Sequence, residues 1–84
     1  MNCEIEAALA YGRLRYSDVE LTYRSPSLFE RDSGGVIIVE SFDRTRRLEH
    51  RLRDLLQMKR KDVFREIDLA VTRFAKVGNS QRLI

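Results

Sequence analysis

The fold of this chain is decided by residues 34–42, Gly34-Gly35-Val36-Ile37-Ile38-Val39-Glu40-Ser41-Phe42. The run over 36–39 is entirely apolar, so both faces of an extended strand would be apolar there. Such a run is typical of a strand that is buried within a sheet. The two glycines before it favour a loop with a permissive backbone. We therefore predict that this stretch is the best-buried strand of a small sheet.

The N-terminal residues predict a short helix. Asn2 is a suitable N-cap, Glu4 and Glu6 favour the positive end of a helix, residues 7–10 are strong helix formers, and Gly12 is a suitable C′ residue. The same residues also alternate in polarity, so a strand is the alternative.

From Arg13 onward the hydrophobic period changes to two. Residues 13–16 and 19–23 alternate apolar and polar side chains on either side of Ser17-Asp18. A two-residue turn there would pair Tyr16 with Val19 on one face and Arg15 with Glu20 on the other. We therefore predict a β-hairpin, with a bulged continuous strand as the alternative.

Residues 43–84 predict the helical half of the molecule. Two apolar stripes follow one another at helical spacing: the first is Leu48, Leu52, Leu55 and Leu56, and the second is Val63, Phe64, Ile67, Ala70, Val71, Phe74 and Val77. Asp62 is a suitable cap for a second helix, and Gly78-Asn79 for its end. The predicted fold is α+β in a single domain over residues 1–84: a short N-terminal helix, a small antiparallel three-stranded sheet, then two C-terminal helices or one long helix.

Charge is divided unequally along the 84 residues. Residues 1–42 carry four arginines and seven acids, a net of −3, whereas residues 43–84 carry twelve lysines and arginines and six acids, a net of +6. An acidic, mostly sheet half beside a basic, helical half favours a polyanionic partner or contact between subunits. Because a chain of this length buries a small core, we also expect a homodimer.

The sequence contains no pattern that indicates catalysis, a cofactor or a metal. His50 and Asp54 stand one helical turn apart and are interpreted as a surface ion pair. A single cysteine, Cys3, provides no disulfide framework and is interpreted as a small apolar residue. No apolar run reaches the roughly 18–20 residues of a membrane span, so we expect a cytoplasmic, non-enzymatic protein without cofactors.

One segment is a candidate contact surface, namely the predicted helix over residues 44–61. Arginine binds phosphate and carboxylate groups through its planar fork. The candidate binding residues are Arg44, Arg46, Arg47, Arg51, Arg53, Lys59, Arg60 and Lys61. On a helix, Arg46, Arg53 and Arg60 would form one solvent-facing row.

The predicted order of a helix, three strands and then a helix is similar to that of the double-stranded-RNA-binding domain. That family starts its second helix with a basic Gly-Ser-Lys-Lys segment, whereas Ser41-Phe42-Asp43-Arg44 stands at the equivalent point of the predicted order. Small phage-encoded inhibitors, anti-CRISPR proteins among them, are similar in size. We therefore expect a small non-catalytic regulator or inhibitor that contacts a protein with an acidic surface. The alternative is a DNA- or RNA-binding module that uses the arginine-rich segment.

Overall fold

The computed structural model describes residues 3–26, 34–53 and 59–82, with the backbone alone for Cys3, Arg60 and 78–82. Its elements follow the order α1 (Cys3–Arg15), β1 (Val19–Arg24), β2 (Val36–Ser41), β3 (Arg47–Arg51) and α2 (Arg60–Arg82). The predicted α+β class is therefore confirmed, with an N-terminal helix, a three-stranded antiparallel sheet and a C-terminal helix. The predicted roles of Asp54, Leu55, Leu56 and the side chains of Cys3 and Arg60 lie outside what is described.

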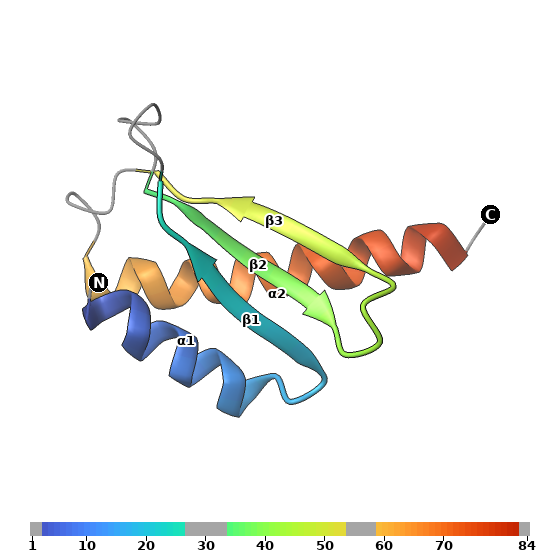
Figure 1. The fold of residues 1–84 in the computed structure, drawn as a ribbon, viewed down its shortest axis with the longest axis horizontal. Helices are drawn as coiled ribbons and strands as arrows, with labels where there is room; N and C mark the ends of the chain where they lie inside the picture. The colour runs from blue at the N-terminus through green and yellow to red at the C-terminus, as the bar shows by residue number, and fades with distance from the viewer. Residues whose placement is uncertain (1–2, 27–33, 54–58, 83–84) are drawn as a thin grey trace.

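The three strands form an antiparallel meander in the order β1-β2-β3, and both helices cover the same face of it (Figure 1). On the helix-covered face, Leu21 of β1 lies opposite Val39 of β2, and Val39 lies opposite Leu48 of β3. The other face, which we call the open face, carries three rungs of mostly polar residues: Glu20, Glu40 and Arg47; Thr22, Ile38 and Glu49; Arg24, Val36 and Arg51. The sheet is thus amphipathic, because successive side chains of a strand point to opposite faces.

Strand β2 is the central strand, as residues 36–39 predicted. Val36, Ile37 and Val39 are all buried, because β2 has a strand on each side and because two helices cover the face that carries Ile37 and Val39. Residues from both helices complete the core, among them Ile5 and Leu9 of α1 and Val63 and Ile67 of α2. The second apolar stripe was therefore predicted correctly as a buried helix face, although Val77 at its end is exposed.

The predicted strand over residues 13–16 is wrong, because α1 continues to Arg15. The Tyr16 N–H donates to the Gly12 carbonyl at 2.8 Å, which completes the last helical turn. Leu14, predicted on a buried strand face, is 87% exposed. The helix persists because Tyr11 and Tyr16 both donate hydrogen bonds to the Asp68 carboxylate of α2. A tertiary contact has therefore overridden a local period of two.

The predicted helix over residues 44–61 is also wrong, and so is one long helix over 44–77, because described residues within both ranges form a strand. Residues 47–51 form β3, which pairs with β2 through Ile37 opposite His50 and Val39 opposite Leu48. Leu48, His50 and Leu52 alternate with charged residues, and this period of two places them toward the core. The spacing of Leu48 and Leu52 fits a helix and a strand equally well, since two residues four apart share a face in both. The third strand therefore comes from the basic half.

A single helix, α2, occupies the C-terminal part of the described chain and has 23 residues. Asp62, predicted as the cap of a second helix, lies within the first turn of α2, where its carboxylate accepts the Lys59 N–H at 3.3 Å and its own N–H donates to the Lys59 carbonyl at 2.9 Å. The helix passes the predicted end at Gly78-Asn79 and continues to Arg82.

Candidate functional site

The eight predicted contact residues do not share one helix face. Arg44 and Arg46 lie in the turn between β2 and β3, Arg47 and Arg51 lie on β3, and Arg53 follows that strand. Lys59, Arg60 and Lys61 lie at the start of α2. The predicted row of Arg46, Arg53 and Arg60 does not exist, because no helix connects these positions.

The β2–β3 turn is fixed by its own polar residues. The Ser41 and Thr45 hydroxyls donate to Asp43 Oδ1 at 2.7 Å each, and the Thr45 N–H donates to the same atom at 3.1 Å. These bonds lower the pKa of Asp43 to about 2, the Ser41 hydroxyl being the largest cause. Arg44 takes a left-handed backbone conformation with φ of 62°. Arg44 therefore lies in a compact turn whose hydrogen bonds come from the turn's own residues.

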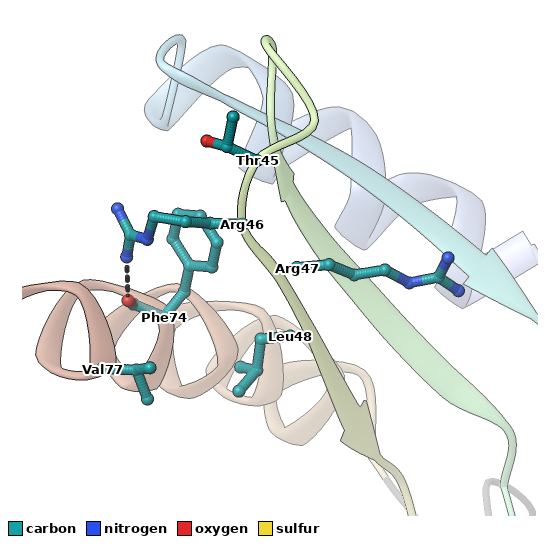
Figure 2. Close-up of a pocket in the computed structure, with 6 residues that line it drawn as sticks. All are labelled: Thr45, Arg46, Arg47, Leu48, Phe74 and Val77. Atoms are coloured by element: carbon teal, nitrogen blue, oxygen red, sulfur yellow. Dashed lines mark hydrogen bonds between the residues drawn. The ribbon is translucent and has the colours of Figure 1, made fainter. Parts of the chain in front are cut away.

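Arg46 holds the start of β3 against α2. Its guanidinium carbon lies 4.1 Å from the centre of the Phe74 ring, and its Nη2 donates to the Phe74 carbonyl at 2.5 Å (Figure 2). The two residues line a pocket of about 200 Å³, together with Thr45, Arg47, Leu48 and Val77. Arg47 points away from Arg46 (Figure 2) and pairs with Glu49 at 3.0 Å. The cationic groups of Arg46 and Arg47 are therefore already engaged within the chain.

Strand β3 ends and helix α2 begins at the same end of the fold (Figure 1), and four predicted contact residues belong to these two chain segments. We call this group, Arg51, Arg53, Lys59 and Lys61, the basic end. All four are exposed. No ion pair to an acid is formed by them among the described residues. The basic end is thus a surface of cations whose charge is available to a partner.

Backbone anchors position the basic end. Leu52, buried between Arg51 and Arg53, donates its N–H to the Gly35 carbonyl at 2.8 Å and accepts the Gly34 N–H at 3.1 Å. Since alternate residues of an extended segment point the same way, Arg51 and Arg53 project together on the side opposite Leu52. On α2, buried Val63 fixes the rotation of the helix and turns Lys61 to solvent.

Sequence reasoning missed Arg65 as a neighbour of this surface. It is exposed and lies one helical turn after Lys61, so the two side chains occupy one face of α2. The i, i+4 spacing was the signal for this pair. Arg65 was overlooked because the contact surface was expected on a separate helix over residues 44–61.

His50 is a buried residue of strand β3, whereas the sequence interpretation placed it on a helix surface beside Asp54, which lies outside the described residues. It lies on the helix-covered face of β3, with Arg73 Nη1 at 2.8 Å from its Nδ1 and Glu66 Oε1 at 3.4 Å from its Nε2. Because arginine can only donate, Nδ1 accepts and the proton of the neutral ring lies on Nε2, toward Glu66. The trio connects β3 to α2, so its hydrogen bonds fasten the sheet to the helix.

The described residues, in all three segments, contain no group of three or more His, Cys, Asp or Glu side chains that could hold a metal ion. None of the helices described here combines the length and apolar character that a membrane span requires. No family model, curated protein or solved structure matches this chain. The site must therefore be interpreted from its own geometry.

Proposed function

We propose that this chain is a non-catalytic binding protein whose basic end contacts the phosphates of double-stranded nucleic acid. The observation that carries the proposal is that Arg51, Arg53, Lys59 and Lys61 are exposed, have no acidic partners among the described residues, and belong to the end of β3 and the start of α2, which lie at one end of the fold (Figure 1). Neutralisation of phosphates by lysine and arginine provides most of the affinity of sequence-independent nucleic-acid binding.

The position of these cations in the fold supports a duplex as the partner. The order of elements remains similar to that of the double-stranded-RNA-binding domain, and the helix after the third strand begins at Arg60 instead of near residue 44. Lys59, Arg60 and Lys61 therefore stand where that family has its basic helix start. Such domains recognise the shape and phosphates of a duplex rather than its bases. The basic end has no aromatic residue that would stack on single-stranded bases.

A regulator or inhibitor that contacts an acidic protein is the second candidate. The open face favours it, because Glu20 and Glu40 lie in one rung with Arg47. The rung has two acids beside one arginine, and a protein surface that carries both acidic and basic groups complements such a mixture, whereas the two carboxylates would repel a phosphate backbone.

The test is a salt titration of binding to an RNA duplex and to a DNA duplex of equal length. If Arg51 and Arg53 each contact one phosphate, R51Q/R53Q should reduce the slope of log affinity against log salt by roughly 2 units. The matched control is R44Q/K76Q, which removes the same charge from exposed positions outside the basic end and should leave the slope almost unchanged.

Two outcomes would count against nucleic acid. Equal slopes for the two double variants would mean that net charge, and not the basic end, determines binding. Absence of binding to either duplex near roughly 50 mM salt, where phosphate contacts are strong, would leave the acidic protein partner as the proposal. That partner would then have to lose affinity for R51Q/R53Q and keep it for R44Q/K76Q.

A further inference from the structure

Strand β1 is an edge strand whose outer backbone groups face a groove. β2 pairs with one side of β1, and no described strand pairs with the other. A groove of about 420 Å³ is lined by residues 19–22 of β1 together with Arg13, Ser17 and Phe42. Phe42 is 59% exposed beside it. An open edge of this kind is a template for pairing with another strand.

The contacts of Arg13 identify which backbone groups point outward. Its Nε and Nη2 donate to the Leu21 carbonyl at 3.2 and 2.9 Å, so that carbonyl faces away from β2. In an antiparallel strand every second residue presents its N–H and C=O on the same side. Val19, Leu21 and Tyr23 therefore present the outer hydrogen-bonding groups of β1.

This edge is complementary to a second copy of itself. If two β1 strands meet antiparallel about a two-fold axis at Thr22, Leu21 lies opposite Tyr23 of the second copy and exchanges both backbone hydrogen bonds with it. On the open face, Glu20 then lies opposite Arg24 of the second copy, and Arg24 opposite its Glu20. Opposite charges directly across a strand pair stabilise that pairing, whereas like charges oppose it.

We propose that two copies of this chain form a homodimer by antiparallel pairing of their β1 strands about this axis. The two sheets become one continuous sheet with all four helices on the same face, because the axis is perpendicular to the sheet. The interface is isologous, as in most homodimers. It also covers an edge strand that would otherwise remain open.

The surface of α1 is compatible with this arrangement. Gly12 lies against Leu21, and α1 runs antiparallel to β1 (Figure 1). From the rise per residue of a strand and of a helix, Thr22 stands at the level of a residue about two positions before Gly12. That residue is Ala10, which is exposed and small. The two α1 helices therefore meet near the axis at a side chain that allows close approach.

Arg13 occupies the outer edge of β1 in the single chain. In a single chain its guanidinium satisfies the outer carbonyl of Leu21. In the dimer that carbonyl accepts the Tyr23 N–H of the second copy, and Arg13 is released. Glu6 is also exposed and lies about two turns before Arg13 on α1. In the second copy, Glu6 belongs to the α1 helix that meets the first copy's α1 at Ala10. Arg13 thus exchanges a backbone acceptor for a carboxylate when the dimer forms.

Sedimentation equilibrium of the whole chain over a concentration series tests the proposal with a charge swap. E20R and R24E each place like charges across the axis in two symmetric positions, so each should weaken the dimer about tenfold or more. The double variant E20R/R24E restores opposite charges and should recover the dimer. R13A frees the Leu21 carbonyl and should not weaken it.

R51E is the matched control, because it reverses an exposed arginine of the open face on the other edge strand. It should dimerise like the unchanged chain, with circular dichroism confirming the fold of every variant. A monomer at tens of micromolar would overturn the proposal. So would a dimer that E20R and R24E leave intact, or one that the swap does not restore. A monomer that binds an extended peptide of another protein along β1 would instead assign the edge to a different occupant.

Discussion

Gly12→Ala should destabilise the protein even though alanine is the better helix former. Gly12 lies where α1 meets both β1 and α2, and a Cβ there would stand 2.6 Å from Leu21 Cδ1 and 2.7 Å from Ile67 Cγ2. Carbon atoms are in favourable contact at about 3.5–4.0 Å, so both neighbours would have to retreat by about 1 Å. Leu21 and Ile67 are each 1% exposed, so neither side chain can move out into solvent.

The magnitude follows from two opposing effects. Replacement of an interior helical glycine by alanine gains about 1 kcal/mol of helix propensity. Overpacking a closed core typically costs about 1–3 kcal/mol, and two simultaneous clashes, one with a β-branched side chain, place this position at the upper end. The free energy of unfolding should therefore fall by about 2 kcal/mol, with a decrease in Tm of roughly 10 °C for a domain of this size.

Urea denaturation followed by far-ultraviolet circular dichroism measures this change. The matched control is Ala75→Gly, an exposed position of helix α2, which measures the propensity effect alone and should cost about 1 kcal/mol. Shortening the opposing side chain in G12A/L21V should recover part of the loss, as a favourable coupling in a double-mutant cycle. The reasoning is refuted if G12A is as stable as the unchanged chain.

Three further predictions concern polar contacts. The Asp43 carboxyl should titrate with a pKa of about 2 by NMR; because this lies below the unfolded value, the stability lost in D43N should be present at neutral pH and vanish as pH falls through about 2. Tyr16, whose hydrogen bond to Asp68 raises its pKa above 10.0, should ionise late in an absorbance titration, and the stability difference from Y16F should disappear as pH rises through that raised pKa. R46A should lower the free energy of unfolding by about 1 kcal/mol through the lost stacking on Phe74, and an unchanged urea midpoint would contradict this.

The sequence predicts an element well where its apolar pattern fits only one kind of secondary structure. Residues 36–39 are apolar on both faces, and only a central strand buries both. The stripe from Val63 to Phe74 repeats over several helical turns, so no strand register fits it. Residues 44–53 were harder because Leu48 and Leu52 share a face in a helix and in a strand alike. The deciding fact is their pairing with β2, which is a long-range contact.

The wrong prediction for residues 44–53 also limited how much of the site could be predicted. Arg51, Arg53, Lys59 and Lys61 were chosen correctly as exposed cations, since arginine and lysine are rarely buried. Their grouping was not predicted, because it arises only when β3 ends beside the start of α2. Arg46 and Arg47 were chosen for the same reason, yet Phe74 and Glu49 engage them. Phe74 lies 28 residues after Arg46, and Glu49 lies two residues after Arg47, a spacing that places two side chains on the same face of a strand but not of a helix.

The two proposed surfaces are geometrically compatible, and this leads to a joint expectation. Arg51 lies in the same rung as Arg24, two strands from the β1 edge and two residues beyond Thr22 along the strand direction. With about 4.8 Å between strands and 3.4 Å per residue, Arg51 is about 14 Å from the proposed axis. The two copies of Arg51 are then about 28 Å apart on one face.

That separation is close to the helical repeat of a duplex, about 34 Å in B-DNA, so one dimer could place both basic ends on successive turns. A linked second contact raises avidity without any new interaction. E20R, which carries more positive charge, should therefore bind a long duplex more weakly than the unchanged chain, whereas it should bind a duplex of half a turn, which reaches one basic end only, at least as tightly. Net charge alone predicts the opposite order for the long duplex, so tighter binding by E20R would show that the two basic ends do not act together.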